Sequence, residues 1–383
     1  MKKILSFLIC LTLFNAVAFA TPVVYEKPDV KIIVEGNELS LEQEVPIIIN
    51  SRTLVPLRKL LVGLGVPDNN ENIQWIGEKK QVKVNYNGVN ISLSIDNTKA
   101  YVNGKEYVLD SAPVIHRSRT YLPARFVGEA LGYSISWDSY TPAVLVTSNT
   151  NMSKLTNILN DLNAAMDRVS SYEVSIMRTT DVTTTYNGVK EKSEYSSVAL
   201  ERADLTNQIV YNEATYKDEF ENNVNFSYST PEALYNCYKY VEDGKIYTTG
   251  WERYQRTSAS EKSPFESKEK LGIVRIDKAL YGSLVRKEYK DAYEISTVSD
   301  QIDILKSLDG QKIYDEVKEN GRVSGLSYKL AISKDTKLPI SLEIHFVVEN
   351  NDVNNGVSTL ENNDYLIDFS EYNGYLNLEL PRV

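Results

Sequence analysis

The sequence predicts an α+β protein that is mostly antiparallel β, with a small duplicated hairpin-and-helix module followed by a curved, open-barrel sheet. Three observations lead to this fold class. A thirteen-residue segment occurs twice, an amphipathic helical pattern follows at 155–169, and strand-like runs then alternate with polar turns up to the C-terminus. Two further helical patterns, at 272–285 and 299–309, predict helices on the concave face of that sheet.

The internal repeat is the most specific feature of the chain. Residues 46–58 read PIIINSRTLVPLR and residues 113–125 read PVIHRSRTYLPAR, at a constant offset of 67 with 7 of 13 positions identical. Each copy continues into a short apolar helical pattern, a glycine and a tryptophan, Trp75 or Trp137. A repeat of this kind indicates one supersecondary unit made twice.

Most repeated positions are ones that shape the backbone. Residues 89–95 and 100–108, between the copies, form a hairpin pattern with Asn103-Gly104 as its turn. The recurring residues are Asn50-Ser51 and Arg117-Ser118 as hairpin turns, Pro56 and Pro123 at helix starts, and Gly65 and Gly132 at left-handed helix ends.

The repeated pattern resembles a known family. Both copies show P-x5-R-T-x2-P-x-R, then a G-x-x-L-G-like helix end, then a tryptophan with a following strand. Over residues 30–147 this is similar to the copper amine oxidase N-terminal-like "stalk" domain, which occurs on many secreted and cell-surface Gram-positive proteins. The resemblance implies an accessory or stalk module, and it does not imply a copper site.

The second half of the chain resembles a carrier fold. A helix, a long strand series, the D-G-K-x-Y sequence that ends at Tyr247 and a terminal proline, Pro381, occur in the order seen in LolA-like (LppX-like) lipoprotein carriers. The resemblance covers residues 153–381. It implies a half-open sheet that holds a hydrophobic ligand on its concave face.

These patterns define the expected domain organisation. Residues 1–20 have a basic start, an apolar stretch and a small-x-small site, which predicts a signal peptide cleaved between Ala20 and Thr21. The apolar stretch is shorter than the roughly 20 residues that a membrane span needs, which argues against an N-terminal membrane anchor. No later stretch is apolar enough to cross a membrane, so we expect no integral span in the mature chain. The duplicated module then takes 30–147, a polar linker 148–152 and the β-rich module 153–383.

Charge and cysteine content exclude some classes of function. The chain of 383 residues has a net charge of −10, and removal of Lys2 and Lys3 with the signal peptide makes it more negative. A nucleic-acid-binding protein needs a basic face instead. Cys237 is the single cysteine after residue 20, so no internal disulfide is expected.

Catalytic and metal sites find little support in the sequence. A zinc or copper site needs three or four nitrogen or sulfur ligands, and the chain offers His116, His345 and Cys237 at distant positions. The S-x-x-K sequence at 267–270 lacks the companion motifs of serine acyl-enzymes. We therefore expect no cofactor, no metal and no catalytic residue.

The candidate binding residues fall into two sets. Arg58 and Arg125 recur near helix starts, where the helix dipole disfavours a cation, so each is expected to have a partner. That partner is either a carboxylate or carbonyl of the chain or an anionic cell-wall polymer, and Arg52 and Arg119 recur beside them. The second set gathers around one predicted hairpin and either packs there or lines a ligand cavity: Tyr235, Tyr238, Tyr240, Tyr247, Trp251 and Tyr254.

The sequence therefore predicts a secreted, non-catalytic cell-envelope protein with a stalk module and a module for a hydrophobic, lipid or lipoprotein ligand. Two alternatives stay open at this point. One is a structural or interaction protein of the cell surface that binds no ligand. The other is an extracellular hydrolase with an unrecognised site.

Overall fold

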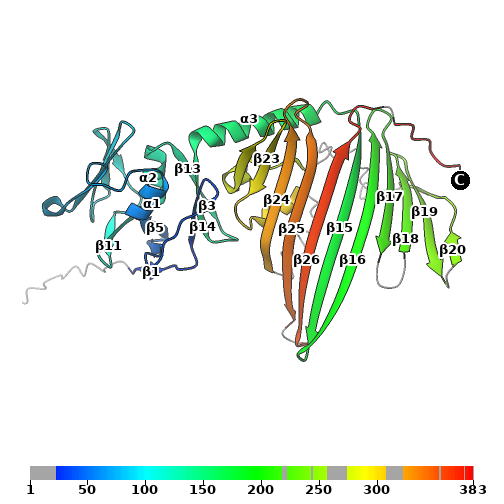
Figure 1. Ribbon diagram of the computed structural model, residues 1–383, viewed down its shortest axis with the longest axis horizontal. Coiled ribbons are helices and arrows are strands. Elements are labelled where there is room, and N and C mark those ends of the chain that lie inside the picture. The colour runs from blue at the N-terminus through cyan, green and yellow to red at the C-terminus, as the bar shows by residue number, and fades with distance from the viewer. Residues whose placement is uncertain are drawn as a thin grey trace, which may run out of the picture.

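Two bodies make up the molecule, joined by the long helix α3 (Asn149–Met166) (Figure 1). The signal peptide with its cleavage site at Ala20 and Thr21, and the sequence at 267–270, lie outside the described residues. The computed structural model describes residues 23–217, 222–242, 245–256, 274–307, 322–352, 355–374 and 376–382.

The duplicated module consists of three small sheets and two short helices. The strand orders are β1-β4-β5-β12-β11, β10-β9-β8-β7-β6 and β13-β14-β2-β3. The first part contains β1 (Tyr25–Glu26), β2 (Lys31–Val34), β3 (Asn37–Glu38), β4 (Ile47–Ile49), β5 (Arg52–Pro56), α1 (Leu57–Gly63), β6 (Ile73–Ile76), η1 (Gly77–Lys79), β7 (Gln81–Tyr86) and β8 (Val89–Ser94). The second part contains β9 (Lys99–Val102), β10 (Lys105–Val108), β11 (Val114–His116), β12 (Arg119–Pro123), α2 (Ala124–Ala130), β13 (Tyr133–Asp138) and β14 (Ala143–Ser148).

The two copies of the repeat meet along β5 and β12. These strands pair antiparallel, with Val55 opposite Leu122. Since the two residues occupy equivalent positions of the repeat, the pairing relates the copies by a local two-fold axis. The module has two main hydrophobic cores, and each takes side chains from both copies of the repeat and from both helices.

Local backbone chemistry explains the repeated residues. Asn50 and Ser51 have φ of 51° and 60°, and Arg117 and Ser118 have 45° and 61°, which are the left-handed values of a two-residue hairpin turn. Pro56 and Pro123 end their strands and directly precede α1 and α2, and Gly65 and Gly132 follow those helices with φ of 86°. The predicted hairpin at 89–108 is instead three strands, β8 to β10, because Asp96 (φ 60°) begins a second turn before β9.

The second module is one twelve-stranded antiparallel sheet that curls into a half-barrel. Its order is β20-β19-β18-β17-β16-β15-β26-β25-β24-β23-β22, and β21 also pairs with β19. Because β15 pairs with β26, the first and last strands meet in the middle of the sheet. The elements are β15 (Ser171–Tyr186), β16 (Val189–Asp204), β17 (Ile209–Lys217), β18 (Asn222–Ser229), β19 (Ala233–Glu242), β20 (Lys245–Thr248), β21 (Glu252–Gln255), η3 (Lys278–Ser283), β22 (Leu284–Glu288), β23 (Ala292–Thr297), η4 (Ile302–Ser307), β24 (Arg322–Ser333), β25 (Pro339–Asp352) and β26 (Val357–Ser370).

The predicted α+β class with a half-barrel sheet is confirmed, and two local predictions change. The polar segment 148–152 is not an irregular linker but the start of α3, because Ser148 caps the helix by accepting a hydrogen bond from the Asn151 N–H. Serine and asparagine suit a helix start as well as a loop. Within the described residues, the predicted helices at 272–285 and 299–309 are the short 3-10 turns η3 and η4.

Direct contacts hold the two modules together. Both carboxylate oxygens of Glu35, in the β2–β3 turn, accept bonds from the start of α3: from Ser148 N at 2.7 Å and Asn151 Nδ2 at 3.0 Å. Across the second contact, the Thr141 hydroxyl donates to Asp300 at 3.2 Å and accepts from its N–H at 3.0 Å. Among the described residues, no helix combines the length and apolar character of a membrane span.

Candidate functional site

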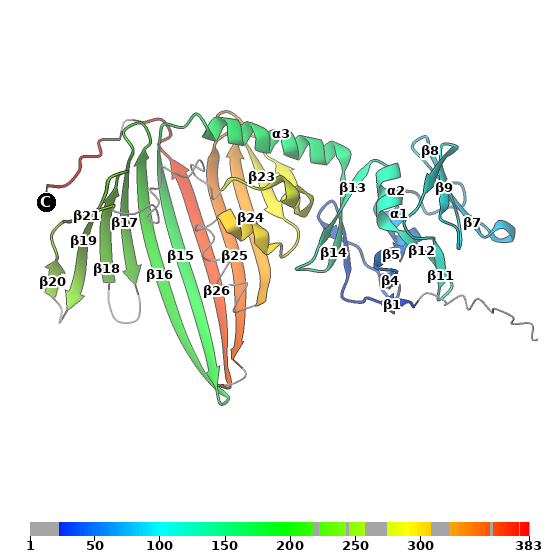
Figure 2. The same ribbon diagram turned by 180° about the vertical axis from the view of Figure 1, so that it is seen from behind.

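The inner face of the half-barrel, defined as the face that packs against α3, is the first candidate site. Over β22 to β26 this face is apolar and filled, because α3 inserts Leu155, Leu159, Leu162 and Met166 into the main core. In Figure 2 the 3-10 segments, coloured yellow to gold, lie in front of β24 on the same side. The chain's own side chains therefore occupy this half of the inner face.

The inner face continues from this core across β15 to β19. Directly paired residues on neighbouring strands share a face of the sheet. The row begins at Ile367, which is 1% exposed, and ends at Tyr238, which is 44% exposed. In order along the row, the paired residues are Ile367, Ile176, Ala199, Ala214, Asn225 and Tyr238.

Among the described residues, two polar acceptors on this part of the inner face have no hydrogen-bond partner. The Oδ1 atoms of Asn223 and Asn225 on β18 are shielded from solvent and accept no hydrogen bond in the described part of the chain. Buried acceptors in native proteins are nearly always satisfied. These two amide oxygens therefore indicate where a donor from outside the chain would be favourable.

A carboxyl group lies beside the same row. Glu201 on β16 accepts a hydrogen bond of 2.7 Å from the hydroxyl of buried Tyr172. Burial raises the pKa of the Glu201 carboxyl, and the bond from Tyr172 opposes that rise only in part. Burial likewise raises the pKa of Tyr172, so the tyrosine keeps its proton and donates.

This carboxyl makes stability depend on pH. A carboxyl whose pKa is higher in the folded than in the unfolded chain lowers stability as pH rises between the two values, by about 1.4 kcal/mol per pKa unit. We expect Glu201→Gln to raise the free energy of unfolding, by more at pH 8 than at pH 4. Urea unfolding at both pH values measures this, with exposed Glu191→Gln on the same strand as control. Equal effects of Glu201→Gln at the two pH values would contradict the assignment.

The predicted aromatic set does not line one surface. The side chains divide between the two faces because successive residues of a strand point to opposite sides. Tyr238, Tyr240, Tyr247 and Tyr254 lie on the inner face, and Tyr240 stacks on Tyr247 with ring centroids 5.4 Å apart. Tyr235 and Trp251 lie on the outer face with Tyr228, whose ring centroid is 5.5 Å from that of Trp251.

The repeated arginines all have carboxylate partners. Arg52 pairs with Asp110 at 2.6 Å, Arg119 with Glu44 at 2.8 Å, and Arg125 approaches Glu129, one helical turn later, at 4.0 Å. Arg58 pairs with Asp68. Each of the four arginines thus has an internal carboxylate partner, which is one of the two expectations.

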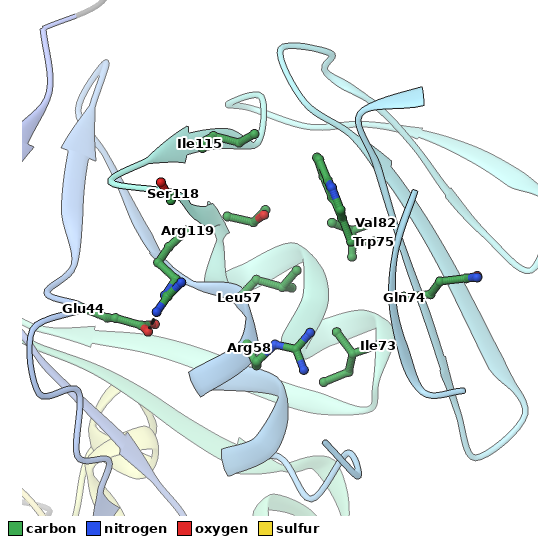
Figure 3. Close-up of a pocket in the computed structure, with 11 residues that line it drawn as sticks. Glu44, Leu57, Arg58, Ile73, Gln74, Trp75, Val82, Ile115, Ser118 and Arg119 are labelled. Carbon is green, nitrogen blue, oxygen red and sulfur yellow. Dashed lines mark hydrogen bonds and ion pairs between the residues drawn. The ribbon is translucent and has the colours of Figure 1, made fainter. Parts of the chain in front are cut away.

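Three of the repeated residues come together in a groove that the sequence did not predict. Trp75 and Arg58 from the first copy and Arg119 from the second line a cavity of about 640 Å³ (Figure 3). Its walls are β6 and β7, the start of α1 and the β11–β12 hairpin. We call this cavity the inter-copy groove.

The histidines and the cysteine occupy separate places. His116 Nε2 lies 2.6 Å from Glu26 Oε1, and His345 Nδ1 lies 2.8 Å from Asp364 Oδ1. Cys237 is a buried free thiol on β19. In the part of the chain that the structure describes, no three His, Cys, Asp or Glu side chains gather as a metal-binding set.

Comparison with known proteins supports the predicted resemblance of the first module. Residues 33–146 match the model of the copper amine oxidase N-terminal domain. No curated protein matches the chain.

Solved structures that are similar to the chain cover 59–60% of its length. A DUF1329 family protein from Desulfovibrio piger ATCC 29098 is 8% identical, with 60% of this chain and 95% of that chain covered and a TM-score of 0.19. A LolA superfamily protein from Nitrosomonas europaea is 8% identical, with 59% and 94% covered and a TM-score of 0.14. A domain described as an outer membrane lipoprotein-sorting protein, from Vibrio parahaemolyticus, is 10% identical, with 60% and 95% covered and a TM-score of 0.18.

Proposed function

We propose that this chain is an extracytoplasmic, non-catalytic binding protein of the cell envelope, and that the inner face of its half-barrel binds a lipid or another ligand with an alkyl chain. The observation that carries the proposal is the inner-face row from Ile367 to Tyr238. It is apolar and buried at one end, and half-buried and polar at the other. The signal-peptide-like start of the sequence supports the location.

The row suits an amphiphile in particular. An alkyl chain laid along Ile176, Ala199 and Ala214 would remove apolar surface from water, which contributes about 0.8 kcal/mol per buried methylene. The paired residues Ala199 on β16 and Ala214 on β17 have small side chains and so add little bulk to the inner face at this point. A hydroxyl or amide of the head group would then donate to Oδ1 of Asn223 and Asn225, which accept no hydrogen bond from the described residues.

A pair of neighbouring variants tests this site. Ala199→Trp places a large ring on the inner face, whereas Val198→Trp places the same ring on the outer face, where Val198 is 47% exposed. With dansyl-undecanoic acid as fluorescent probe, we expect saturable binding by the wild type. Ala199→Trp is expected to weaken it at least tenfold and Val198→Trp to leave it unchanged.

The same titration also distinguishes a lipid-binding protein from a structural protein without a ligand. Equal weakening by both variants would place the probe elsewhere, and absence of saturable binding by the wild type would favour a structural protein without a ligand. Since the proposed role is non-catalytic, an alkyl ester offered as ligand should be recovered intact after incubation. Recovery of its hydrolysed products would favour the hydrolase instead.

A further inference from the structure

The inter-copy groove has an apolar wall that remains open to solvent. Trp75 is 44% exposed and Ile115 is 49% exposed, and Figure 3 shows them on opposite sides of the cavity with Leu57 between them at its floor. In the described part of the chain, the indole Nε1–H of Trp75 has no hydrogen-bond acceptor. Because the ring is exposed, it offers a ligand both an apolar face and an N–H donor at its edge.

The two arginines of the groove are held by carboxylate partners, but they do not use all of their N–H donors. Arg119 uses Nε for Glu44, and Arg58 uses one terminal nitrogen for Asp68. A guanidinium has five N–H donors in a planar fork, so each arginine keeps donors for a ligand. Ser118 and Thr120 add hydroxyl groups to the same wall.

The charge balance of the groove favours a neutral ligand. Arg58 and Arg119 are each paired with a carboxylate, so the four charged groups cancel. The chain as a whole carries −10, which would repel a polyanion. The anionic polymer considered from the sequence therefore fits this groove less well than an uncharged one.

We propose that the inter-copy groove binds a neutral glycan chain, with one sugar ring stacked on Trp75 and its hydroxyl groups held by Arg58 and Arg119. A pyranose ring has an apolar C–H face and a rim of hydroxyl groups, which matches an exposed aromatic ring flanked by paired donors and acceptors. The volume of about 640 Å³ lies in the range of small-ligand sites. This site lies in the duplicated module and the proposed lipid site lies in the half-barrel. A test of glycan binding is therefore independent of a test of lipid binding.

The repeat supplies a matched control for the key residue. Trp137 occupies the position equivalent to Trp75 in the second copy and is 46% exposed. Trp75→Ala and Trp137→Ala thus remove the same side chain from the same local fold with nearly equal exposure. Only the first substitution changes the inter-copy groove.

Calorimetric titration of the full chain tests the inference. The neutral probes are chitohexaose and cellohexaose, and the anionic probes are polygalacturonate and poly(glycerol phosphate). We expect at least one neutral hexasaccharide to bind, with little change on added salt because no net charge is neutralised. Trp75→Ala should weaken binding at least tenfold, and Trp137→Ala should leave it unchanged.

A second variant distinguishes loss of binding from misfolding of Trp75→Ala. Arg119 is 60% exposed in its side chain, so Arg119→Gln should fold normally and still weaken binding several-fold. Three outcomes would overturn the inference: no binding of either neutral hexasaccharide, binding of the anionic polymers alone with strong salt dependence, or equal loss in Trp75→Ala and Trp137→Ala.

Discussion

Replacing Phe346 by alanine is expected to lower the free energy of unfolding of the half-barrel by about 3–5 kcal/mol. Phe346 points to the inner face of β25 and is 2% exposed. Its ring stacks on Tyr365, with centroids 6.1 Å apart and planes 12° from parallel. Since α3, the strands β15 to β17 and the strands β22 to β26 all contribute to this core, a cavity here cannot be closed by one side chain.

Urea unfolding followed by circular dichroism measures this loss, and the adjacent residue provides the control. His345 lies on the outer face and pairs with exposed Asp364, so His345→Ala should cost only about 0–1 kcal/mol. If Phe346→Ala lowered the free energy of unfolding by less than about 1 kcal/mol, the core would not depend on the packing of Phe346 against Tyr365.

Substituting alanine for Gly36 is expected to loosen the contact between the two modules. Gly36 has φ of +81° in the β2–β3 turn, and a Cβ there would lie 2.8 Å from Val285 Cγ1 and 3.2 Å from Val298 Cγ1. The left-handed backbone costs about 1–2 kcal/mol for an L-residue. Overpacking against the two valines adds about 1–3 kcal/mol.

Gly104 separates these two effects. It has φ of +80° in a turn of the same form, but a Cβ there would meet nothing within 4 Å. Gly104→Ala should therefore show only the backbone cost, whereas Gly36→Ala should also speed proteolysis between the modules. If the two variants lose the same stability and are cleaved at the same rate, the modules are not packed through Val285 and Val298.

Local chemistry made the duplicated module predictable from the sequence. The turn pairs, the prolines before α1 and α2 and the glycines after them act within a few residues, and each occurs twice. Segments that depend on distant packing were harder to assign. Residues 278–283, for example, have an apolar helical pattern but form a 3-10 turn that packs against α3 and against β13 and β14 of the duplicated module.

Neither candidate site could be predicted without knowing which strands pair and in which register, and a single sequence does not give this information. Arg58, Arg119 and Trp75 stood out individually as repeated residues, but the groove exists because β5 pairs with β12, 67 positions later. Similarly, the tyrosines near β19 are close along the chain, yet the pleat sends Tyr235 and Tyr238 to opposite faces. Glu201 gave no signal among the many charged residues of β16, and its burial follows from facing Tyr172.

The most direct test of the proposed ligand site is native mass spectrometry of the full protein with and without an alkyl-chain ligand. We predict an adduct of one ligand per chain on the wild type after incubation with palmitate. The same adduct should form on Val198→Trp and be absent from Ala199→Trp. A wild-type spectrum that stays at the mass of the chain alone, or an adduct that survives in Ala199→Trp, would contradict the inner face as the binding site.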